Sequence, residues 1–86
     1  MSISVQRDSS YADGPPSPTN PALLILANPT IGVAAQTIVD SGGTGSWNTL
    51  TSQAFTPTGN GWVTVRIISY DQSGASVVSF ADFSIT

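Results

Sequence analysis

The strongest constraint on the fold is the alternation of side chains over residues 62–70, which is typical of a β-strand. One face of this strand would carry aliphatic residues only, namely Val63, Val65 and Ile67. The other face would carry two aromatic rings and an arginine among its members, namely Trp62, Thr64, Arg66, Ile68 and Tyr70. Apolar residues nowhere recur at helical spacing over more than one turn, because Pro or Gly interrupts most windows. The chain is therefore expected to be all-β.

Further strands are predicted from short apolar or alternating runs that end at Gly, Pro or Asn. These runs are residues 3–6, 22–27, 31–39, 47–55 and 75–85. Two turns are predicted to close hairpins, one over residues 58–61, which contain Asn60-Gly61, and one over residues 71–74. Six to seven short strands with turns between them predict an antiparallel β-sandwich. The last strand has apolar residues on both faces, which leaves its register open.

The length and the charge of the chain exclude several classes of protein. Its 86 residues make one domain, residues 1–86, and the net charge is −3 with only two arginines and no lysine. Binding to nucleic acid or to anionic membranes requires clusters of basic residues, so neither partner is expected. No apolar run is long enough for a membrane-spanning helix, and residues 1–5 lack the pattern of a secretory signal.

The chain has few side chains suited to catalysis or to the binding of a cofactor or a metal. Cys, His, Lys and Glu are all absent, which leaves five aspartates as the general bases. The best carboxylate pair, Asp71 and Asp82, falls at a turn and in a strand, and the spacing of Asp40 to these two matches no calcium loop. The glycine-rich loop of residues 41–45 has no lysine to bind a phosphate. We therefore expect a protein that is not an enzyme and that has no cofactor and no metal site.

Three segments of the second half resemble the C-terminal strands of jelly-roll domains of the carbohydrate-binding-module type, which also occur in phage virion accessory proteins. The segments are residues 45–50 (GSWNTL), residues 55–66 (FTPTGNGWVTVR) and residues 78–85 (VSFADFSI). Ala81 stands where the family has the first Asp of its closing pair, which puts a calcium-supporting role in doubt. The chain is also shorter than a complete domain of this type. The resemblance implies a jelly-roll-like sandwich with open strand edges, which favours a homo-oligomer.

The aromatic face of residues 62–70 leads to two functional hypotheses. Its candidate residues, together with an earlier tryptophan, are Trp62, Arg66, Ile68, Tyr70 and Trp47. In the first hypothesis this face is buried, either as the second face of a central strand or against a neighbouring subunit, since aromatic residues and Arg are enriched in interface cores. In the second hypothesis it stacks on sugar rings. The aliphatic Ile68 in its middle favours burial.

Residues 1–21 are predicted to form an N-terminal strand followed by a proline-rich arm that reaches a neighbouring copy. The residues expected to make these contacts are Ile3, Val5, Tyr11, Pro15, Pro16 and Pro18. Proline restricts the unbound arm, which lowers the entropy lost on binding. The leading hypothesis is a structural protein of a virion, of the capsid decoration type, whose partners are sister copies and a capsid or other virion protein. The alternatives are a glycan-binding or host-adhesion module at the extracellular surface and a subunit of an extracellular filament.

Overall fold

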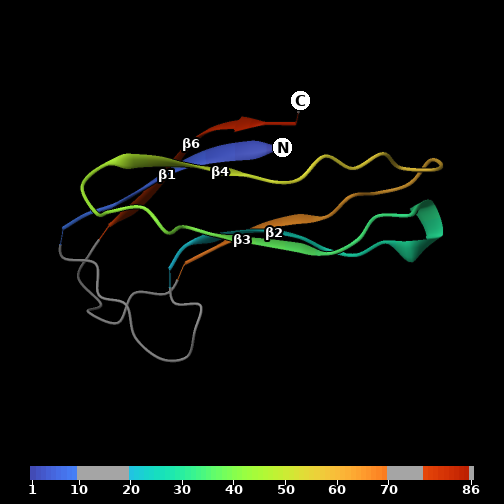
Figure 1. The fold of residues 1–86 in the computed structure, drawn as a ribbon, viewed down its shortest axis with the longest axis horizontal. Coiled ribbons are helices and arrows are strands. Elements are labelled where there is room, and N and C mark those ends of the chain that lie inside the picture. The colour runs from blue at the N-terminus through green and yellow to red at the C-terminus, as the bar shows by residue number, and fades with distance from the viewer. Residues whose placement is uncertain (10–19, 70–76, 86) are drawn as a thin grey trace.

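The computed structural model describes residues 1–9, 20–69 and 77–85, and these residues form two small antiparallel sheets. The elements are β1 (Ser2–Arg7), β2 (Ala22–Ile25), the 3₁₀ helix η1 (Pro29–Ile31), β3 (Gln36–Val39), β4 (Trp47–Thr51), β5 (Val65–Ile68) and β6 (Val78–Ser84). One sheet has the strand order β4-β1-β6 and the other the order β3-β2-β5. The two sheets lie as separate layers (Figure 1). The expected all-β class is confirmed.

Strand β1 is the centre of the first sheet, and its alternating sequence decides which side chains enter the core. It pairs with β4 on one side and with β6 on the other. Ile3, Val5 and Arg7 are buried, whereas the residues between them are half-buried. The period of two residues places these three side chains on the face that looks toward the second sheet.

Strand β2 occupies the same central position in the second sheet, where it pairs with β3 and β5. Its continuous apolar run suits this place, because a central strand is covered more fully than an edge strand. Leu23 and Ile25 are almost completely buried. Asn28-Pro29 ends the run, as expected, and η1 follows with Gly32 in the left-handed region at φ 72°.

In the part of the chain that the structure describes, the hydrophobic core consists of two clusters between the sheets. The first contains Ile3, Val5, Leu23 and Leu50, with Ile38, Val65 and Val78 packed against them. The second lies around η1 and contains Ile25, Ile31 and Val33, with Met1, Phe55 and Val63 packed against them. Because the first cluster draws on both sheets, its burial holds the two layers together.

The hairpin predicted at Asn60-Gly61 is wrong. Strand β4 belongs to the first sheet and β5 to the second, so residues 52–64 cross from one layer to the other. The turn packs on η1 instead, where Ile31 accepts a hydrogen bond from the backbone N–H of Thr58 at 2.9 Å. Strand β5 is also shorter than the predicted strand and begins at Val65. The second predicted hairpin turn, residues 71–74, lies outside the described residues.

A β-bulge in β6 settles the register that the sequence left open. Ser2 lies opposite Ser84 and Ser4 opposite Ala81, so that Asp82 and Phe83 together face Ile3. Asp82 has a φ of 56° in the left-handed region, which Asp and Asn tolerate better than most residues. The extra residue shifts the alternation of inward-facing and outward-facing side chains by one position. Phe80 lies opposite the inward-facing Val5, and after the bulge Phe83 again lines the space between the sheets.

Candidate functional site

The two sheets meet closely on one side and are open on the other. Strand β3 lies against β4, whereas the other two edge strands, β5 and β6, are further apart. Three inward-facing residues on these strands remain substantially exposed: Ile67 at 42%, Phe80 at 36% and Phe83 at 45%. We call the surface formed by β5, β6 and the adjoining Ile85, which is 75% exposed, the open side. A closed sandwich would bury the inner faces of both strands.

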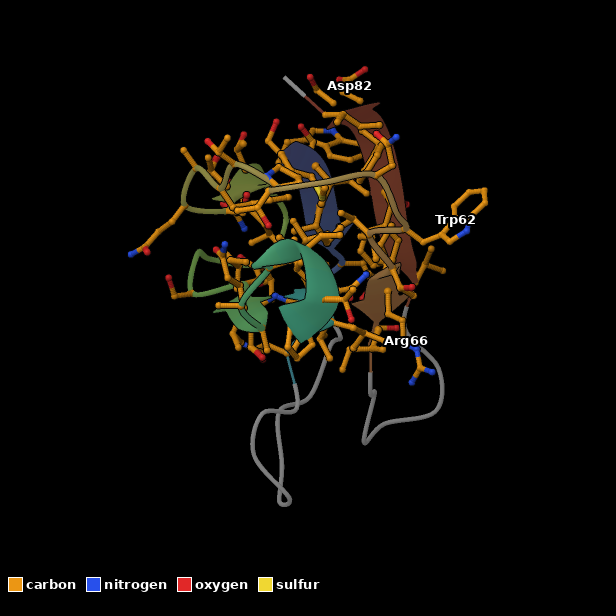
Figure 2. The ribbon with its side chains drawn as sticks, turned by 90° about the vertical axis from the view of Figure 1, so that its right-hand side faces the viewer. Trp62, Arg66 and Asp82 are labelled. Atoms are coloured by element: carbon orange, nitrogen blue, oxygen red, sulfur yellow. The ribbon has the colours of Figure 1, made fainter. Side chains whose placement is uncertain are left out.

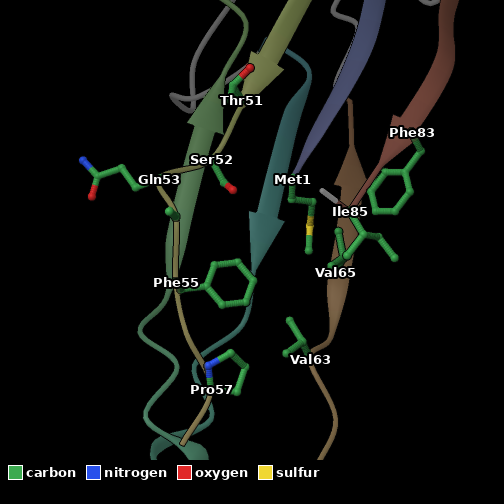
Figure 3. Close-up of a pocket in the computed structure, with 11 residues that line it drawn as sticks. Met1, Thr51, Ser52, Gln53, Phe55, Pro57, Val63, Val65, Phe83 and Ile85 are labelled. Atoms are coloured by element: carbon green, nitrogen blue, oxygen red, sulfur yellow. The ribbon is translucent and has the colours of Figure 1, made fainter.

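An apolar groove of about 700 Å³ runs between the sheets beyond the N-terminal start of β1. Met1 lies in its middle, Phe55 lies on one wall, and Val65, Phe83 and Ile85 lie on the other (Figure 3). The hydroxyl oxygen of Ser52, which also lines the groove, is buried and has no hydrogen-bond partner in the described structure. The groove therefore offers a largely apolar surface that continues the open side, together with one unused polar atom.

Two opposite charges flank the open side. Arg66 on β5 and Asp82 on β6 are both exposed, and neither forms an ion pair with another described residue. The view along the molecule in Figure 2 shows Asp82 at the top and Arg66 in the lower half, with Trp62 extending between these heights. The open side thus has an acidic group at one level and a basic group at the other.

Only some of the candidate residues of the aromatic face lie on the same part of the structure. Trp62 precedes β5 and is 86% exposed, Arg66 is exposed, and Ile68 is half-buried. Because β5 is an edge strand, the expectation of a second buried face on a central strand is wrong. Trp47 starts β4 on the opposite edge of the first sheet and is 52% exposed, so it does not join this face. Tyr70 lies outside the described residues.

The structure also places the N-terminal residues expected to reach a neighbouring copy. Ile3 and Val5 are 3% and 0% exposed in this chain's own core, and β1 is paired on both sides. Strand β1 is therefore a core strand of its own chain rather than an arm. The other four candidate residues of the arm, Tyr11, Pro15, Pro16 and Pro18, lie outside the described residues.

A buried ion pair that the sequence analysis missed joins the two sheets at the end far from η1. Arg7 from β1 is 4% exposed and Asp40, directly after β3, is 0% exposed. Arg7 donates a hydrogen bond from Nε to Oδ2 of Asp40 at 2.8 Å. The signal for the arginine of this pair was present in the sequence, since the alternation Ile3, Val5, Arg7 points its side chain inward.

Neighbouring groups satisfy much of the hydrogen-bonding capacity of this pair. The guanidinium group also donates to the side-chain oxygen of Asn20 and to the carbonyl oxygen of Gly42. The second carboxylate oxygen of Asp40 accepts from the backbone N–H of Gly42 at 3.0 Å. Asn48 donates from Nδ2 to the carbonyl oxygen of Gly43 at 3.1 Å. A buried pair supported in this way is a structural element, and it anchors the glycine-rich loop of residues 41–45 to both sheets.

The glycine at position 42 is required by this network, and a substitution there tests it. A Cβ atom on Gly42 would overlap the side-chain amide of Asn48, whereas a Cβ atom on Gly43 would meet nothing within 4 Å. We expect Gly42→Ala to lower the free energy of unfolding by about 1–3 kcal/mol, because Asn48 must move away from its partners. Gly43→Ala is the matched control and should be neutral or slightly stabilising. Equal urea midpoints for the two variants would contradict this role of Gly42.

Other kinds of site receive little support from the residues that the structure describes. In these ranges no three acidic, histidine or cysteine side chains come together as a metal site. No helix within the same ranges is long and apolar enough to cross a membrane. No protein-family model, curated protein or solved structure matches the chain. The open side and its groove are thus the principal candidate site.

Proposed function

We propose that this chain is a non-catalytic structural protein that works by assembly, with sister copies as its first partner. The observation that carries the proposal is the exposure of Ile67, Phe80 and Phe83 on strand faces that normally lie in a core. Contiguous exposed apolar surface of this kind marks interaction sites in small soluble domains. Among the described residues no strand pairs with the outer edges of β5 and β6, so these edges offer backbone groups to a further strand.

A phage virion accessory protein of the capsid decoration type is the class that we propose for it. The resemblance of residues 45–50, 55–66 and 78–85 to jelly-roll domains supports this class, and we propose that the two sheets are a reduced sandwich of that type. A surface with few charged residues suits a protein packed among other subunits, because charged residues are depleted from interface cores. The second partner would then be a capsid protein, and the location would be the virion.

The molar mass of the untagged chain in solution tests the assembly function. Light scattering after size-exclusion chromatography at several concentrations should give a multiple of 8.8 kDa for the natural chain. Phe83→Ser should shift this mass toward the monomer, because it removes an exposed apolar ring from the open side. Trp47→Ser, which removes an exposed ring from the opposite edge, should leave the mass unchanged. A monomer at all concentrations would contradict the proposal.

Glycan binding is a second candidate function, and the exposure of Trp62 supports it. An indole ring that is 86% exposed presents a flat apolar face of the kind that stacks on a pyranose ring. If this function holds, a glycan array should give specific binders, and Trp62→Ala should abolish their binding without changing the unfolding midpoint. An array without binders would remove this candidate.

A further inference from the structure

We infer that the open side binds a second copy of this chain around a two-fold axis parallel to the strands, so that β5 of each copy pairs with β6 of the other. This inference rests on the proposed assembly function and specifies its surface and geometry. The two three-stranded sheets of each copy would continue into those of the partner. Each combined sheet would have the order β4-β1-β6 followed by β5-β2-β3 of the partner copy.

The directions of the strands suit this arrangement. Strand β6 is antiparallel to β1 and β5 is antiparallel to β2. In Figure 1, β6 runs from left to right toward the C-terminus, and β5 (orange) runs from right to left. Rotation about an axis parallel to the strands keeps each direction, so β6 and the β5 strand of the partner copy would be antiparallel. Antiparallel pairs are the commoner and slightly more stable kind.

The charges at the open side are complementary under the same rotation. Asp82 lies at the top and Arg66 in the lower half of the view along the molecule in Figure 2. A half-turn in that view exchanges the upper and lower heights. It therefore brings Arg66 of each copy to the height of Asp82 of the other copy. Their neighbours in sequence, Val65 and Phe83, both line the apolar groove, so each charge lies beside the same apolar surface. Such a reciprocal contact is characteristic of an isologous dimer.

The apolar surface is large enough for an interface between two copies. Ile67, Phe80, Phe83 and Ile85 are 36–75% exposed. With usual side-chain areas they present on the order of 400 Å² of apolar surface. The exposed ring of Trp62 extends between the two charges in Figure 2 and adds to this area, as do the paired strand edges. Together they would bring the buried area of each copy toward the ~800 Å² of a standard interface.

Other pairings of the same edges are less favourable. A two-fold axis perpendicular to the sheets would pair β6 with β6 and β5 with β5. That arrangement would bring the two Asp82 side chains toward each other, and likewise the two Arg66 side chains. Like charges across paired strands are destabilising. The pairing of β5 with β6 is thus the one in which the exposed charges attract.

Sedimentation equilibrium of the full chain tests the inference through the dissociation constant of the dimer. Arg66→Gln and Asp82→Asn should each raise this constant about tenfold, because each removes both symmetric ion pairs. Asn is the appropriate replacement, since it also tolerates the positive φ at position 82. Arg66→Glu should raise the constant further, because it places two carboxylates together. Thr49→Asp on β4, at the opposite edge, is the control and should have no effect.

The combination of two substitutions gives the sharpest result. Asp82→Asn should weaken the dimer of the natural chain but strengthen the dimer of the Arg66→Glu chain, since it removes an attraction in the first and a repulsion in the second. Weakening on both backgrounds, or no change on either, would overturn the inference. If the natural chain forms oligomers that these substitutions do not affect, the inference fails while the assembly function stands. A natural chain that is always monomeric contradicts both.

Discussion

Replacement of Asp40 with alanine is expected to lower the free energy of unfolding by about 3–5 kcal/mol, since it leaves the charge of Arg7 buried without its partner. Arg7 is only 4% exposed, so bulk water compensates for the lost carboxylate only in part. A loss of this size is a large share of the ~5–15 kcal/mol by which a domain is stable. Urea unfolding followed by circular dichroism measures it.

The second arginine of the chain provides a matched control for this prediction. Arg66 is exposed on an edge strand, and Arg66→Met should change the unfolding free energy of the monomer by less than about 0.5 kcal/mol. Arg7→Met should destabilise far more, and Arg7→Met combined with Asp40→Leu should recover part of the loss, because no buried charge then remains. Similar effects for the two Arg→Met variants would contradict a structural ion pair between the sheets.

Ile3→Ala is expected to be the second large effect, with a loss of about 2–5 kcal/mol in the free energy of unfolding. Ile3 is 3% exposed and packs in the cluster that both sheets share, so the smaller side chain leaves a cavity between the layers. Its neighbour Ser4 provides the control, because Ser4 points to the other face of the same strand. Ser4→Ala should change stability by less than about 0.5 kcal/mol.

The same pair of variants decides between a core strand and an exchanged arm. If residues 2–6 reached a neighbouring copy, Ile3→Ala would reduce the mass of the assembly and leave the unfolding of the single chain unchanged. The structure predicts the opposite result, namely that Ile3→Ala destabilises the single chain itself. Thermal unfolding at a concentration low enough to give monomers separates the two outcomes.

Local patterns predicted the central strands well. The alternation at Ile3 and Val5 requires only that one face of the strand be covered. The apolar run from Ala22 to Ile25 requires only that both faces be covered. The same alternation also points Arg7 inward, although a lone basic residue at a strand end is usually read as exposed. Its partner Asp40 could not be identified in the same way, because the two residues meet only when the sheets face each other.

The errors concern features that depend on contacts distant in sequence. Asn60-Gly61 is a strong hairpin signal, but a turn sequence does not specify whether the chain returns to the same sheet. The bulge at Asp82 has no local signal of its own, since an Asp is also a common strand-end residue. The exposure of Ile67 depends on β5 being an edge strand, and the sequence of a strand does not state its place in the sheet.

The buried pair of Arg7 and Asp40 joins the sheets at one end, and the contact of β3 with β4 closes one side. The open side remains, with apolar residues and two exposed charges of opposite sign. A partner that supplies strand edges to both sheets would close it.

Cysteine crosslinking tests most directly whether a second copy closes the open side by pairing β5 with β6. The natural chain has no cysteine, so each introduced thiol is unique. Chains with Arg66→Cys mixed with chains with Asp82→Cys should give a covalent dimer with a short bismaleimide, and neither chain alone should do so efficiently. Efficient crosslinking of the Asp82→Cys chain with itself, or no crosslinking in the mixture, would contradict the account.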